Sequence, residues 1–211
     1  MSDLVRQLTA DLAPAPHAQV QRRLLAGLGG GLLVSIALTL ALLGPRPDMM
    51  PAMHTMMFWA KLIYPLSFAV IAGFAAERLA RPAASAAARI VWLPLPGVLV
   101  LILALVAVLL APPDTRDAMM MGHSARLCPF LVLACSVPPL LGLIWAMRGL
   151  APVKLGETGF VIGLAAGGAG AFAYAWHCNE TGAPFLAVWY SLGILAAALL
   201  GSLLGPRLLR W

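Results

Sequence analysis

Six long apolar blocks, separated by short polar segments, are the most regular feature of the sequence. Each block is about 20 residues long, and at about 1.5 Å of helical rise per residue this length crosses a bilayer core of about 30 Å. The blocks cover residues 24–43, 56–76, 91–111, 127–147, 159–176 and 185–204. This pattern predicts an all-α, polytopic membrane protein in which residues 24–211 form a bundle of six transmembrane helices.

Residues 1–23 precede the first block and form the only sizeable polar stretch. Their apolar positions recur at the spacing of a helix: Leu4, Val5, Leu8 and Leu12. A short cytoplasmic amphipathic helix is therefore predicted here, ended by Pro14 and Pro16. Its polar face carries a single arginine, whereas helices that bind lipid surfaces usually carry more cations. Binding to a groove on a soluble partner fits better than an interfacial helix, which is the alternative.

The composition and the charge distribution agree with a membrane protein and predict its orientation. The chain has 211 residues, of which 62% are hydrophobic and 10% charged, and its formal net charge is +6. With the N-terminus inside, most Lys and Arg residues fall in inner segments, while the outer segments hold Arg46, Arg116 and Arg126. This asymmetry predicts that both termini are cytoplasmic, with membrane lipid as a partner of the basic inner loops. Because no segment forms a basic patch, direct binding of nucleic acid is not expected.

Residues that can carry chemistry gather in the loop between the fifth and sixth blocks, at the outer face of the membrane. This loop holds His177, Cys178 and Glu180, and Cys128 begins the fourth block at the same predicted depth. Thiolates bind soft metal ions and the outer compartment of bacteria is oxidising, so a shared metal site or a disulfide is available to Cys128 and Cys178. Two unrelated interfacial thiols are the alternative, because chain spacing does not show that the helix ends are neighbours. Cys135, about 10 Å deeper in the fourth block, is predicted to be a packing thiol.

Lys61 lies inside the second block, about one and a half helical turns from its outer end. An ionisable group within a membrane span is a functional candidate by default. The alternative is that the side chain extends along the helix and brings its ammonium to the outer surface between Trp59 and Tyr64.

Prolines and glycines mark positions where helices should bend or approach one another closely. Pro138 and Pro139, in the middle of the fourth block, predict an irregular helix with either a hinge or a static kink. Gly163, Gly167 and Gly170, in the fifth block, predict a smooth stripe for tight helix packing. Both features are expected to shape the helix packing and are not assigned a chemical role.

Several short motifs are distributed over the whole chain. They are residues 3–12 followed by Pro14, residues 58–61, the Cys128-Pro129 pair, residues 177–181 leading to Trp189-Tyr190, and residues 205–211. Jointly they resemble the NrsF-like family of bacterial six-span anti-sigma factors. These inner-membrane proteins hold an extracytoplasmic-function (ECF) sigma factor inactive and release it under stress. Asn179 stands where the family loop often has Pro before its Glu.

The resemblance implies a role for each end of the protein. The N-terminal segment of residues 1–23 would bind a cytoplasmic ECF sigma factor through its apolar positions: Leu4, Val5, Leu8 and Leu12. Cys128 and Cys178 would sense heavy-metal or oxidant stress on the periplasmic side. The auxiliary candidates beside them are Lys61, His177 and Glu180.

The expected function is therefore that of a membrane-bound anti-sigma factor and not of an enzyme. No cofactor is required, although a heavy-metal ion could bind transiently at Cys128 and Cys178. A periplasm-facing thiol/quinone oxidoreductase is one alternative, but such enzymes commonly use two dithiol pairs, and the outer segments hold only these two cysteines. A small-solute transporter is the other, and Lys61 alone is sparse for ion coupling within the spans.

Overall fold

The computed structural model describes residues 17–81, 91–150 and 152–210. Within these ranges the chain is helical, with turns and loops between the helices and no β-strand. The all-α class predicted from the apolar blocks is confirmed. The predicted N-terminal amphipathic helix, with Leu4, Val5, Leu8 and Leu12, lies outside the described residues.

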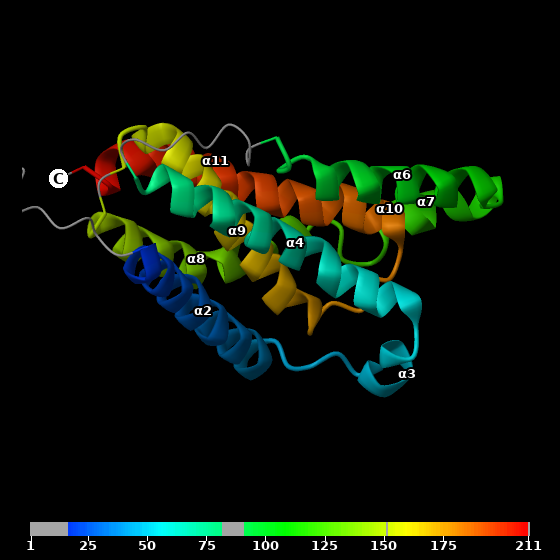
Figure 1. The fold of residues 1–211 in the computed structure, drawn as a ribbon. Helices are drawn as coiled ribbons and strands as arrows, with labels where there is room; N and C mark the ends of the chain where they lie inside the picture. The colour runs from blue at the N-terminus through cyan, green and yellow to red at the C-terminus, as the bar shows by residue number, and fades with distance from the viewer. Residues whose placement is uncertain (1–16, 82–90, 151, 211) are drawn as a thin grey trace, which may run out of the picture.

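Five long helical segments form the bundle, with shorter helices at one of its ends (Figure 1). The long ones are α2 (His17–Leu42), α4 (Met56–Leu79), α8 (Cys128–Arg148), α9 (Leu155–Ala175) and α11 (Ser191–Leu208). The shorter ones are α3 (Met49–Met53), α6 (Leu95–Leu110), α7 (Pro113–Met121) and α10 (Ala183–Phe185). A π-helical turn, η1 (Leu186–Tyr190), joins α10 to α11, so that these three make one continuous apolar rod.

The prediction of six spanning helices is wrong at the third block, because five helices of the described chain are long and apolar enough to cross a membrane. The block at residues 91–111 contains the shorter α6, which has 16 residues. Residues 91–94 are turns, because Pro94 is the N-cap of α6 and Pro96 occupies its first turn. Pro112 follows at the other end. A helix of this length rises about 24 Å, less than a bilayer core of about 30 Å.

Helix α9 is the centre of the bundle and packs against α2, α4, α8 and α11. Its glycines let neighbouring backbones come close, because a Cβ on Gly163 would lie 2.5 Å from the Ala197 carbonyl oxygen of α11. The stripe predicted from Gly163, Gly167 and Gly170 is divided between two neighbours. Gly163 and Gly167 face α11, whereas Gly170 faces Ser136 of α8.

Helices α2 and α8 are joined through small residues and through the proline pair of α8. Gly27 of α2 packs against Gly142, and α8 remains helical through Pro138 and Pro139. Pro139 has no N–H for the Cys135 carbonyl one turn earlier. Ser35 of α2 donates to that carbonyl instead, at 2.7 Å. The second helix therefore supplies the hydrogen bond that the proline removes.

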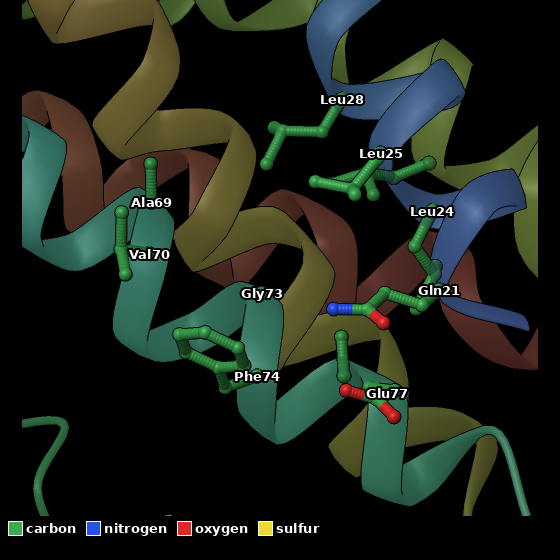
Figure 2. Close-up of a pocket in the computed structure, with 11 residues that line it drawn as sticks. Gln21, Leu24, Leu25, Leu28, Ala69, Val70, Gly73, Phe74 and Glu77 are labelled. Carbon is green, nitrogen blue, oxygen red and sulfur yellow. The ribbon is translucent and has the colours of Figure 1, made fainter. Parts of the chain in front are cut away.

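A groove of about 180 Å³ separates α2 from α4 (Figure 2). Its lining is mostly apolar, with Leu24, Leu28, Val70 and Phe74 among the side chains, and Gln21 lies at one end of it beside α4. The contacts between α2 and α4 are correspondingly few. Helix α2 is therefore held in the bundle mainly by α8 and α9.

The two ends of the bundle differ in what they carry. The start of α2 lies beside the end of α8, where the Arg23 guanidinium is 5.1 Å from the Trp145 ring centroid. The end of α11 lies there too, because Arg148 donates to the Leu208 carbonyl at 2.7 Å. We call this the terminal end, since both described chain ends lie at it (Figure 1). The opposite end, with the first residue of α8 and the loop after α9, is called the thiol end.

Candidate sensing site

The structure brings Cys128 and Cys178 together at the thiol end. Cys128 is the first residue of α8, and Cys178 lies in the loop of residues 176–182 between α9 and α10. Their side chains are 0% and 3% exposed, and they are close enough to share a hydrogen bond. Both are free thiols. The placement is that of one buried dithiol pair and differs from two unrelated interfacial thiols.

Lys61 lies beside this pair and does not reach the surface, so the alternative of an outward-extended side chain is wrong. Its side chain is buried, and its ammonium donates to the carbonyl oxygens of Cys178 and Glu180, each at 2.6 Å. Trp59, two residues earlier, is half exposed on another face of α4. The helix therefore directs Lys61 into the bundle, where the loop after α9 supplies the oxygens that a buried ammonium requires.

Tyr190, in the π-helical turn η1, closes the site from the side of α11. It is fully buried, and its ring centroid lies 5.4 Å from the Lys61 nitrogen. Its hydroxyl interacts with the Cys178 sulfur through a hydrogen bond. Within the described chain this hydroxyl has no other hydrogen-bond partner. Tyr174 of α9 packs against Tyr190, with 6.0 Å between ring centroids. Cys178 is thus enclosed by hydrogen-bond donors.

These neighbours lower the pKa of the Cys178 thiol to about 5. The hydrogen bond with Cys128 is the largest cause, the Lys61 charge and the Tyr190 hydroxyl act in the same direction, and burial opposes them. The thiolate is the form that attacks oxidants and binds soft metals. The arrangement therefore makes Cys178 the more nucleophilic thiol at neutral pH.

Glu180 turns away from the two thiols and holds the neighbouring loop. Its carboxylate accepts hydrogen bonds from the backbone N–H groups of His123 and Ser124, at 2.6 and 3.2 Å. The Ser124 carbonyl in turn accepts from the Cys128 N–H at 2.9 Å. Gly122 has a φ of +51°, and a Cβ there would meet the Glu180 carboxylate. Glu180 therefore fixes the turn from which α8 and Cys128 begin.

His177 is not part of the thiol cluster. Its Nδ1 forms a hydrogen bond of 2.9 Å with the Gly44 carbonyl in the loop after α2. Among the described residues, no group of three or more His, Cys, Asp or Glu side chains could hold a metal ion. Of these residue types in the described ranges, the site offers a metal ion the two sulfurs.

Arg46 is a buried cation that the sequence analysis counted only for orientation. Its guanidinium forms an ion pair with the Asp48 carboxylate through two hydrogen bonds of 2.8 and 2.7 Å. The backbone N–H of Arg46 donates to the Trp176 carbonyl at 3.0 Å. Its guanidinium lies 5.8 Å from the Phe58 ring centroid. The sequence feature that could have indicated this ion pair is an Arg and an Asp two positions apart in a loop with several prolines. Arg46 ties the loop after α2 to the end of α9.

The fold and the site define a helical protein with five helices long and apolar enough to cross a membrane in its described chain, and with a buried dithiol pair at one end of the bundle. The sequence profile of the NrsF family, described as negative regulator of sigma F, matches residues 8–211. The chain belongs to this family.

Two curated relatives are similar over almost their whole length. The anti-sigma-F factor NrsF of Caulobacter vibrioides (strain NA1000 / CB15N) is 39% identical over 216 residues, with 99% of this chain and 98% of the relative covered. The probable anti-sigma-F factor NrsF of Azospira oryzae (strain ATCC BAA-33 / DSM 13638 / PS) is 35% identical over 213 residues, with the same coverage. No solved structure matches this chain. Membership of the family indicates a regulatory rather than a catalytic role, which disfavours the oxidoreductase and transporter alternatives.

The lowered pKa of Cys178 predicts an unusual pH dependence of its alkylation. The cysteine thiolate attacks iodoacetamide and displaces iodide, so the alkylation rate at Cys178 should stay nearly constant from pH 8 to pH 6, above a pKa of about 5. An ordinary thiol with a pKa of about 8.5 slows about tenfold per pH unit in the lower part of this range. The measurement is mass spectrometry of the Cys178 peptide in a Cys135→Ala background.

Cys128→Ala is the matched control for this experiment. It removes the hydrogen bond that contributes most to the lowered pKa, so the rate at Cys178 should become pH-dependent. A tenfold decrease per pH unit in the protein that keeps both thiols would contradict the assigned role of Cys128.

Proposed function

We propose that this chain is a bacterial inner-membrane anti-sigma factor whose N-terminal segment sequesters an ECF sigma factor in the cytoplasm. Release of the sigma factor follows a chemical change at Cys128 and Cys178 on the periplasmic side. The observation that carries the proposal is the buried thiol pair at the end of the bundle opposite to the start of α2. Family membership supplies the class of partner.

The partner-binding part of the proposal is residues 1–23. Both curated relatives are named anti-sigma-F factors, which supports a sigma factor as the protein bound here. The apolar positions assigned to the contact are Leu4, Val5, Leu8 and Leu12. They directly precede α2, so a displacement of α2 would move or reorient the bound segment.

The location of the chain ends supports cytoplasmic placement of both termini. The start of α2 and the end of α11 lie at the terminal end of the bundle. Helix α4 ends at that same end and α8 begins at the thiol end, so the connection between them joins opposite ends of the bundle. Helix α6 is part of this connection. The shortness of α6 is therefore compatible with both chain ends lying on one side of the membrane.

The thiol pair fits two kinds of signal. A soft metal ion binds the Cys178 thiolate and displaces the thiol proton of Cys128, and two-sulfur coordination is the arrangement that the described residues offer. A periplasmic oxidant takes two electrons from the thiolate and the thiol, the Cys128 proton leaves, and an S–S bond forms. Either change replaces the hydrogen bond between Cys128 and Cys178 by bonds of fixed length.

The change at Cys128 has a direct structural route to α2. Cys128 begins α8, and α8 packs along α2 through Gly27 and Gly142 and through the Ser35 hydrogen bond to the Cys135 carbonyl. A shift of α8 is therefore imposed on α2. A coupling of about 1–3 kcal/mol, typical of allosteric systems, would change the affinity for the sigma factor by about 5- to 150-fold.

Substitutions on the apolar face of the N-terminal segment should abolish capture of the sigma factor. Leu4→Asp together with Leu8→Asp places charges where apolar contacts are proposed, and a loss of about 2 kcal/mol or more per contact residue is expected. Gln7→Asp together with Thr9→Asp adds the same charge on the polar face and should leave capture intact. Co-purification of the sigma factor with the full-length protein from detergent-solubilised membranes measures the difference. Equal capture by both variants would show that residues 1–23 act as a lipid anchor.

Replacement of the thiol pair should separate inhibition from sensing. The double variant Cys128→Ser and Cys178→Ser is expected to bind the sigma factor as before and to keep it bound when cadmium or an oxidant is added. Cys135→Ser, which removes the deeper thiol bonded to Thr39, should respond like the unaltered protein. Transcription from a sigma-dependent reporter in cells measures the response. A normal response of the double variant would refute the sensing role of the pair.

A further inference from the structure

The Lys61 side chain fastens the loop that carries Cys178 to α4. The Lys61 ammonium donates to the Cys178 carbonyl and to the Glu180 carbonyl, each at 2.6 Å, and so spans the residue between them. On its α9 side the loop begins with a turn in which the Cys178 N–H donates to the Tyr174 carbonyl at 3.1 Å. Lys61 therefore fixes the part of the loop that lies beyond this turn.

The same contacts explain why a lysine is stable at this buried position. An ammonium that leaves water needs hydrogen-bond acceptors, and two carbonyl oxygens with the Tyr190 ring provide them. The two carbonyls also depend on the lysine, because a buried carbonyl needs a hydrogen-bond donor. The loop and the lysine therefore hold each other in place.

Cys128 is positioned from a different element. Its helix begins at the turn that Glu180 binds through its carboxylate, while the Glu180 carbonyl is bound by Lys61. The loop of residues 176–182 thus lies between α4 on one side and the start of α8 on the other. Loss of the Lys61 contact would free Cys178 to move away from Cys128 while leaving α8 in the bundle.

We propose that Lys61 is a positioning residue of the sensing site, which holds Cys178 against Cys128 so that one ligand can bind both sulfurs. This inference rests on the proposed function of the thiol pair and assigns that site a residue from α4. A residue needed only for folding would give a different result, because its replacement would lower capture only as far as it lowers the thermal unfolding midpoint.

The test is capture of phenylarsine oxide by the purified full-length protein in a Cys135→Ala background. This trivalent arsenical forms two As–S bonds with a close pair of cysteines, and its oxygen leaves as water with the Cys128 proton and one proton from solvent. Intact-protein mass spectrometry after a challenge with excess 2-mercaptoethanol measures the arsenical retained. A complex held by two sulfurs resists the challenge, because the second bond forms at high effective concentration.

Three variants distinguish positioning from folding. Lys61→Met should lower the fraction of chains that retain the arsenical by about tenfold, since the Cys178 loop loses its bonds to α4 and one arsenic atom can no longer bind both sulfurs. Lys61→Arg keeps a cation with several N–H donors and should retain most of the capture. Lys154→Met is the matched control, because Lys154 is the other lysine of the chain and is exposed in an ion pair with Glu157. Any fall in the thermal unfolding midpoint of Lys61→Met in detergent should be too small to unfold the protein at the temperature of the assay.

Retention by Lys61→Met at the level of the unaltered protein would overturn the proposal. So would equal losses in the arginine and methionine variants, or a loss that tracks a lower unfolding midpoint. Failure of the unaltered protein to retain the arsenical would refute the dithiol site itself, and with it the sensing part of the proposed function. The two failures are therefore distinguishable.

Discussion

A buried ammonium needs oxygen atoms around it, and this requirement organises the thiol end of the protein. Lys61 meets it with the carbonyls of Cys178 and Glu180. Those two bonds place the loop after α9 beside α4, and the Glu180 carboxylate then binds the turn before α8. The ion pair of Arg46 and Asp48 closes the same end from the loop after α2. Charged side chains are rare in the rest of the bundle. Here they connect α2, α4, α8 and α9 through the loops at their ends.

The remainder of the bundle depends on close packing of small residues. Helix α9 is almost fully buried, and its glycines admit the backbones of α11, α4 and α8 on different faces. The contact of α2 with α8 is of the same kind, whereas a groove separates α2 from α4 (Figure 2). Helix α2 is therefore packed closely against the helix that begins with Cys128. The proposed coupling of the thiol pair to the N-terminal segment uses this contact.

Much of this architecture could be predicted from the sequence, because apolar blocks of bilayer length leave few other folds. The third block was misjudged, since its prolines shorten α6 although every residue between them is apolar. The face of α4 that turns inward was not predictable, because apolar residues surround that helix on all sides. For this reason the sequence left two roles open for Lys61, a functional group within the membrane span or an ammonium extended to the outer surface. The depth of Cys128 and Cys178 could be predicted, but their pairing depends on which helices are neighbours, and that follows from the glycine contacts of α9 and from the Lys61 bridge.

A membrane between the thiol end and the terminal end is the central claim of the proposed function. Labelling with a membrane-impermeant maleimide tests it directly in a variant whose three cysteines are replaced by serine. Asn179→Cys places one exposed thiol in the Cys178 loop, and Arg210→Cys places one at the terminal end. The account predicts that spheroplasts with an intact inner membrane label at position 179 alone and that position 210 labels only after the membrane is opened. Labelling of both positions from the same side would contradict it.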